Sequence, residues 1–172
     1  MKKAIYAVLA LLILSGAALA GTNEFSKGSF FITPQVGINA WAVPFGVNAE
    51  YAITPNIGIG GTVMVWLWGD TWYSYSIISP SVEGVYHFTQ LKLDKIDLFA
   101  GAALGYTIYS FSTKEDIGFT GSLGSSGLDL GLVLGGRYFF SDKIAVSLRS
   151  SGSFIGGWAG FGGALGVTIR LK

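Results

Sequence analysis

The chain has no cysteine, few charges and no apolar run long enough to cross a bilayer as a helix. Its 172 residues include no Cys, only 12% charged residues and four Pro, and the formal net charge is +1. Without Cys, no disulfide can hold the fold together and no thiolate metal site can form. A net charge near zero gives no basic surface for nucleic acid. The fold must therefore be held by packing, hydrogen bonds and side-chain ion pairs.

The first twenty residues, MKKAIYAVLALLILSGAALA, have the pattern of an export signal. A basic start precedes an apolar run over residues 4–14, and residues 18–20 (Ala-Leu-Ala) give the small-x-small pattern that signal peptidase cleaves. A membrane-spanning helix needs about 20 apolar residues, which is longer than this run. We expect residues 1–20 to be a cleaved signal peptide and residues 21–172 to form one mature domain.

The clearest structural pattern is the alternation in GLDLGLVLGGRYFFSDKIAVSLRSSGSF, residues 127–154. Large apolar residues occupy every second position before a polar turn at residues 141–143 and resume after it, which predicts an antiparallel hairpin. The opposite face holds small and charged residues, among them Asp129, Arg137 and Arg149. A soluble sheet buries its large apolar face, whereas a membrane barrel turns that face to lipid and encloses the polar one.

Similar alternation recurs after a polar lead-in over residues 21–29 and predicts eight strands. They cover residues 30–39, 45–53, 57–68, 75–88, 96–110, 127–140, 144–154 and 158–171. Each is about as long as a tilted membrane strand, and an even number of strands allows the closure that lipid requires. The fold class is therefore all-β: a transmembrane antiparallel up-and-down β-barrel of eight strands with a polar lumen filled by side chains. The longest loop is expected at residues 111–126.

Aromatic residues concentrate near both sets of predicted strand ends, as in the interfacial girdles of membrane barrels. One set comprises Trp41, Trp66, Trp68, Trp72, Tyr73, Tyr75 and Trp158, and the other Tyr51, Tyr86, Phe88, Tyr138, Phe139 and Phe140. We expect the second set at the periplasmic interface, beside the short turns at residues 54–56, 89–95 and 141–143.

The export signal, the eight segments and turns such as EYAITPNIGIGG and RYFFSDKIAVSLR resemble the small outer-membrane β-barrel superfamily typified by OmpA and OmpX. The resemblance covers nearly all of the mature chain and concerns architecture, because no catalytic motif takes part in it. It implies a protein of the cell outer membrane that needs no cofactor. The implied partners are outer-membrane lipid, including lipopolysaccharide, and the barrel-assembly machinery during biogenesis.

Six charged residues are expected to point into the lumen and to form an ion-pair network there. They are Glu50, Glu83, Asp97, Asp129, Arg137 and Arg149. Charges removed from bulk water persist only when they are paired, and eight strands enclose too little space for a wide pore. Pairing the strands through their turns places Glu83 within reach of Arg137, with Arg149 joining them. The predicted role of this network is structural.

The single histidine, His87, is the only residue that can support a histidine-based mechanism. The predicted register places it opposite Asp97, near the periplasmic end of the lumen. Ser79 and Ser81 are too far along an extended strand to reach it, at about 3.3 Å per residue. No Gly-x-Ser-x-Gly elbow is present, and one His with scattered carboxylates predicts no metal site. We interpret His87 as structural.

These patterns together predict a non-enzymatic integral outer-membrane protein with a structural or surface-interaction role and no nucleic-acid partner. A surface ligand is expected at the Gly- and Ser-rich residues 111–126 if this loop is a binding element rather than an inert tip. The first alternative is a narrow channel or conduit for small or hydrophobic solutes. A lipid-modifying outer-membrane enzyme and a secreted lipocalin-like barrel, with its large residues pointing inward, are further alternatives.

Overall fold

The structure, a computed structural model, describes residues 25–39, 43–69, 73–113, 122–156 and 161–171. The predicted signal peptide lies outside these residues. The strands are β1 (Phe30–Asn39), β2 (Phe45–Ala52), β3 (Ile57–Gly69), β4 (Tyr73–His87), β5 (Ile96–Thr113), β6 (Ser122–Ser141), β7 (Ile144–Ile155) and β8 (Phe161–Arg170). One 3-10 turn, η1 (Thr89–Leu91), lies between β4 and β5. The described residues include no helix that is long and apolar enough to cross a membrane.

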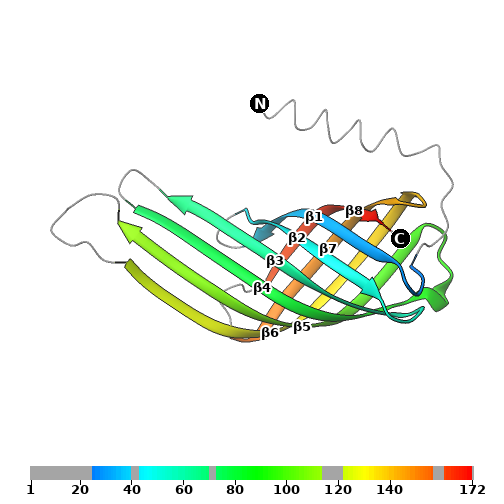
Figure 1. Cartoon of the computed structure of the whole chain (residues 1–172), viewed down its shortest axis with the longest axis horizontal. Helices are drawn as coiled ribbons and strands as arrows, with labels where there is room; N and C mark the ends of the chain where they lie inside the picture. The colour runs from blue at the N-terminus through cyan, green and yellow to red at the C-terminus, as the bar shows by residue number, and fades with distance from the viewer. Residues whose placement is uncertain (1–24, 40–42, 70–72, 114–121, 157–160, 172) are drawn as a thin grey trace, which may run out of the picture.

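The eight strands form one closed antiparallel barrel (Figure 1). Each strand pairs with the next along the chain, and β1 closes the sheet by pairing with β8, for example at Phe31 and Arg170. The predicted up-and-down barrel is therefore confirmed, and β1 has the predicted bounds. The predicted loop at residues 111–126 is wrong at both ends, because β5 continues to Thr113 and β6 begins at Ser122.

Large apolar side chains cover the outside of the barrel, and most of the side chains buried inside it are polar or charged. On β5, the outward Leu98 and Leu104 are 38% and 49% exposed, whereas the inward Asp97 is fully buried. A continuous exposed apolar belt of this kind marks a surface that faces hydrocarbon. From Ile96 to Ile108 the outward residues span about 40 Å along the strand, or just under 30 Å in height at the roughly 45° tilt of membrane strands. The lipocalin-like alternative is thus wrong.

The aromatic girdle is present at the end of the barrel that carries the short turns. Tyr51, Tyr86 and Tyr138 all point outward there and are 45%, 42% and 45% exposed. Phe139, which was predicted in the same girdle, is fully buried because the alternation of β6 turns it into the lumen. At the opposite end, Trp66 also points inward and is only 5% exposed.

Strands β3–β6 extend beyond the other four, so the barrel wall is much taller on one side (Figure 1). Pairing of β2 with β3 ends at Phe45 and Val65, and pairing of β6 with β7 ends at Leu130 and Ile155. Beyond these points β3, β4, β5 and β6 continue to pair with one another. We call this part the projecting sheet; it comprises residues 66–69, 73–78, 106–113 and 122–129.

The outward face of the projecting sheet changes from apolar to polar partway along its strands. Ile78 and Ile108 are 42% and 44% exposed and are the last large apolar residues on the outward faces of β4 and β5. The next outward positions hold serines, and Ser74 and Ser112 share a hydrogen bond of 2.7 Å. Hydroxyl groups are costly to place in hydrocarbon, so the apolar belt ends at this change on β4 and β5, whereas the outward Leu67 of β3 is still 60% exposed.

Candidate functional site: the lumen and its outer mouth

The half of the lumen next to the short turns contains a cluster of four charged or titratable side chains, which we call the inner ionic cluster. Glu50, His87, Asp97 and Arg137 come from β2, β4, β5 and β6 and are at most 2% exposed. The imidazole lies between two carboxylates, with Nε2 2.6 Å from Glu50 and Nδ1 2.8 Å from Asp97. Arg137 donates to the same two carboxylates.

Hydrogen bonding and charge are both balanced in this cluster when His87 is protonated. A carboxylate can only accept, so contacts at both ring nitrogens call for an N–H on each. Two carboxylates then face one imidazolium and one guanidinium, and the cluster is neutral. Buried charges are tolerated when they are paired and hydrogen-bonded in this way.

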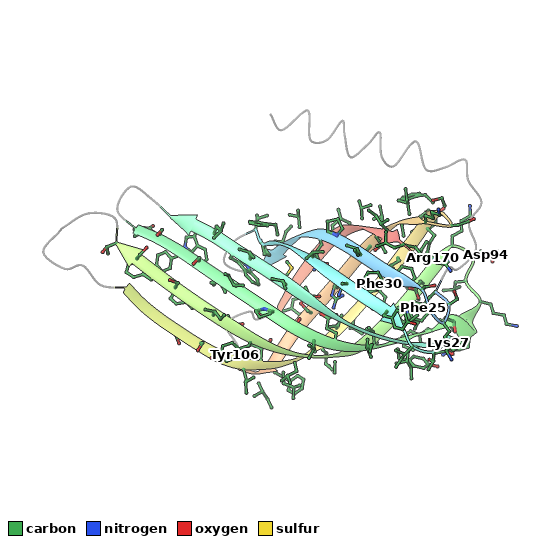
Figure 2. All side chains as sticks on the ribbon, viewed as in Figure 1. Phe25, Lys27, Phe30, Asp94, Tyr106 and Arg170 are labelled. Carbon is green, nitrogen blue, oxygen red and sulfur yellow. The ribbon has the colours of Figure 1, made fainter. Side chains whose placement is uncertain are left out.

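Aromatic rings enclose the inner ionic cluster. Phe25, which precedes β1, stacks on the His87 ring with centroids 3.5 Å apart and an interplanar angle of 12°. The Arg137 guanidinium lies 4.9 Å from the Phe31 ring and 5.1 Å from the Phe99 ring, within cation–π range. Figure 2 shows Phe25 at the end of the barrel where Arg170 also lies. Phe25 therefore closes the lumen at that end.

A second group, the outer ionic cluster, lies farther along the lumen. Glu83 of β4 pairs with Arg149 of β7, and both residues are 7% exposed. The carboxylate also accepts from Thr62 at 2.7 Å and from Asn48 at 3.3 Å. An apolar layer of Val85, Phe99 and Val133 is also buried in the lumen.

The predicted partner of Glu83 is therefore wrong, since Arg149 and not Arg137 pairs with it. The predicted register placed Glu83 and Arg137 within reach of each other. In the structure Glu83 is opposite Ala103, and Arg137 is opposite Asp97. These shifts carry Arg137 toward the short-turn end, where it contacts Glu50 and Asp97 instead.

The sixth predicted lumen charge, Asp129, lies apart from both clusters. It is 7% exposed and accepts a hydrogen bond from Thr107, which also contacts Ser79 at 3.1 Å. Asp129, Glu83 and Arg149 all line a cavity of about 110 Å³ in the lumen. The structure therefore distributes the six predicted residues over two ionic clusters and the wall of one cavity.

Beyond this cavity the inward face of the projecting sheet carries a group of rings, which we call the aromatic shelf. It consists of Trp68, Tyr73, Tyr75, Tyr109 and Phe111. Trp68 and Tyr75 stack with centroids 5.1 Å apart, and Tyr75 lies 4.6 Å from Phe111. The predicted outer girdle is wrong for Trp68, Tyr73 and Tyr75, because these rings face across the mouth of the lumen. Trp41, Trp72 and Trp158 lie outside the described residues.

Several contacts in the lumen were not predicted from the sequence. Asn48 and Thr62 are opposite each other in the β2–β3 pairing and both contact Glu83, so inward polar pairs on neighbouring strands could have indicated them. Phe25 lies in the predicted polar lead-in, where no alternation marks it. Trp66 was predicted in a girdle because tryptophan is common at membrane interfaces, although alternation places this residue on the inward face.

No arrangement typical of a catalytic or metal site is present in the described ranges. Both ring nitrogens of His87 contact carboxylates, whereas Ser81 contacts Glu83 at 3.3 Å and Ser79 contacts Thr107. Within the same ranges, no group of three or more His, Asp or Glu residues is arranged to hold a metal ion.

Comparison with solved structures identifies small barrels of bacterial outer membranes. The N-terminal β-barrel domain of Pseudomonas aeruginosa OprF superposes with a TM-score of 0.65 at 14% identity, over 84% of this chain and 98% of that one. OprG from the same organism gives 0.62 at 9% identity, over 87% and 99%. Ail, the attachment invasion locus protein of Yersinia pestis, gives 0.53 at 15% identity, over 84% and 99%. The chain has the fold of the small outer-membrane β-barrels.

This likeness is one of backbone architecture. No protein-family model and no curated protein sequence matches the chain. At 9–15% identity, a shared fold carries neither ligand nor activity from these proteins to this one.

Proposed function

We propose that the protein is a non-conducting barrel of the outer membrane that acts at the cell surface through its projecting sheet. The observation that carries this proposal is the closed lumen. The inner ionic cluster, the apolar layer of Val85, Phe99 and Val133, and the outer ionic cluster are all buried. A barrel filled in this way is a rigid support, and rigid supports commonly present binding surfaces at their rims.

The proposed location follows from the apolar belt, the girdle and the likeness to outer-membrane barrels. Outer-membrane lipid, including lipopolysaccharide, would contact the belt, and the barrel-assembly machinery would insert the chain. The part of the projecting sheet beyond Ile78 and Ile108 would then stand outside the lipid, because the outward serines begin where the apolar belt ends on β4 and β5.

We propose a non-enzymatic role because the described lumen offers no activated nucleophile. An imidazole acts as a general base when one ring nitrogen faces the hydroxyl or water that it deprotonates. Glu50 and Asp97 occupy both ring nitrogens of His87.

One observation favours the conduit alternative, namely the cavity in the lumen. Single-channel recording in planar lipid bilayers separates the two functions. We expect no stepwise conductance from the folded protein, with a wide pore-forming barrel reconstituted in parallel as the positive control. Heat modifiability on a denaturing gel verifies that the reconstituted sample is folded. Reproducible conductance steps from that sample would replace the proposed function by the conduit.

A further inference from the structure

We propose that the outer mouth of the lumen binds neutral carbohydrate. In this arrangement the aromatic shelf packs against a sugar ring, and the cavity below it receives the hydroxyl groups of the ring. The inference rests on the proposed function, because it assumes that the projecting sheet is the part that acts. It adds the chemical class of the ligand.

The cavity below the shelf has the mixed donors and acceptors that hydroxyl groups need. Its lining includes Ser79, Ser81, Asp129 and Arg149, together with Gln35. A sugar hydroxyl donates one hydrogen bond and accepts others, so it can satisfy carboxylate, guanidinium and hydroxyl partners together. At about 110 Å³ the cavity has room for several waters or for the edge of one ring.

Trp66 gives an independent indication that a polar ligand group enters this cavity. Its side chain is 5% exposed and lines the cavity, and its indole N–H has no hydrogen-bond acceptor among the described residues. Buried N–H groups almost always have an acceptor, because an unsatisfied one loses its hydration without compensation. A sugar oxygen in the cavity would supply that acceptor.

The aromatic shelf begins one inward position beyond Trp66, at Trp68. Trp68 and Tyr75 are opposite each other in the β3–β4 pairing, and Tyr75 is opposite Phe111 in the β4–β5 pairing. The rings therefore form a continuous surface across three strands. The face of an aromatic ring is electron-rich and attracts the C–H groups that line one face of a pyranose. Stacking beside convergent polar groups is the combination that orients a sugar.

The charges of the mouth favour a neutral ligand. Residues 66–69, 73–78, 106–113 and 122–129 include no Lys or Arg, so the projecting sheet offers no cation to a sulfate or phosphate group. In the cavity wall, Arg149 is already paired with Glu83. A wholly apolar ligand would leave the Trp66 N–H without an acceptor. A neutral polyhydroxyl ligand satisfies both the rings and the polar groups.

Binding of the full-length mature chain to neutral oligosaccharides tests the proposal. The protein is refolded into phospholipid nanodiscs without lipopolysaccharide and applied to an array of neutral and sulfated glycans. We expect binding to neutral glycans, followed by titration calorimetry with one bound oligosaccharide. Tyr75→Ala should weaken that binding about tenfold, as expected for loss of one stacking contact. The conservative Trp66→Phe should weaken it as well, because it removes the indole N–H.

Tyr86→Ala is the matched control, since Tyr86 lies on the same strand but faces outward at the opposite end. It should bind as the unaltered protein does, and heat modifiability checks that every variant is folded. Adding lipopolysaccharide to the nanodisc distinguishes the sources: competition identifies the sugar of the membrane itself, and unchanged binding identifies a free oligosaccharide. Both results support the proposal.

Three results would overturn it: no binding to neutral glycans by the folded protein, binding restricted to sulfated glycans, or equal loss in Tyr86→Ala. Recognition of a protein with no glycan binding would also overturn the carbohydrate assignment while leaving the surface role intact. Because conductance is measured separately, an absence of glycan binding would not contradict the proposed non-conducting barrel.

Discussion

Glu83 is held by side chains from three other strands and one on its own. Arg149, Thr62 and Asn48 contact its carboxylate from β7, β3 and β2, and Ser81 contacts it from β4. Such a group depends on its partners, because a carboxylate left alone in a buried site retains the full cost of its lost hydration.

We predict that Glu83 and Arg149 are energetically coupled. Glu83→Gln or Arg149→Met alone should each destabilise the folded barrel by about 3–5 kcal/mol, and the double variant by clearly less than the sum. Urea titration in lipid vesicles, followed by tryptophan fluorescence, gives the free energies of unfolding. Glu83→Gln with Arg137→Met is the control pair, which should be additive within about 0.5 kcal/mol. Additivity in the first pair would contradict the assignment of partners.

Gly58 makes room for the inner ionic cluster. A Cβ at this position would overlap the Glu50 carboxylate, whose two oxygens contact His87 and Arg137. Gly58→Ala should therefore destabilise the barrel by about 1–3 kcal/mol, as overpacking commonly does. Gly84→Ala is the matched control, because its Cβ would meet no atom within 4 Å. The same urea titration applies, and equal stability of the two variants would disprove the role of Gly58.

The sequence predicted which way the lumen residues point and the contact of His87 with Asp97, but not the partner of Glu83. Alternation fixes the face of Glu83 and Arg137, since each inward residue follows its neighbour by two positions. A register error of two or four residues keeps that face and changes only the partner. Contacts such as that between Glu83 and Arg149 therefore depend on turn geometry and on the exact pairing of every intervening strand.

At the scale of elements, β4, β5 and β6 each have a middle part in the apolar belt and an outer end in the projecting sheet. Their middle parts follow the membrane pattern, with large apolar side chains outward. Their outer ends reverse it on β4 and β5, where Ser76 and Ser110 face outward and Tyr75 faces inward. The sequence predicted a loop at residues 111–126 because this stretch is rich in Gly and Ser, whereas the pairing of β5 with β6 continues to Ser112 and Ser122.

We predict that an outward-facing charge on β5 destabilises the barrel only on the short-turn side of this reversal. Leu104→Arg should destabilise the barrel by about 2–4 kcal/mol because it puts a cation in hydrocarbon, whereas Ser110→Arg should cost about 0–1 kcal/mol. Unfolding titrations in vesicles of one lipid measure both variants. A large cost at Ser110 would mean that the apolar boundary lies beyond Ile108.

At the scale of the whole molecule, the short turns and the projecting sheet lie at opposite ends of the barrel. The chain has no cysteine, so a single introduced thiol reports its own position. Ser112→Cys on the projecting sheet should react with a membrane-impermeant maleimide on intact cells. Asp142→Cys, which is also exposed and lies in the turn between β6 and β7, should react only after the outer membrane is permeabilised. The reverse pattern would invert the proposed orientation.

The pairing of β1 with β8 also has a kinetic consequence. It joins Phe31 to Arg170, and Leu171 donates to the carbonyl of Phe30, so this seam connects the two ends of the described barrel. Contacts that are so distant along the chain form slowly, because a long loop must be closed before any hydrogen bond is gained. Every other strand pair is a local hairpin. We therefore expect the seam to be the last part of the barrel to assemble, with both of its edges shielded from other strands until then.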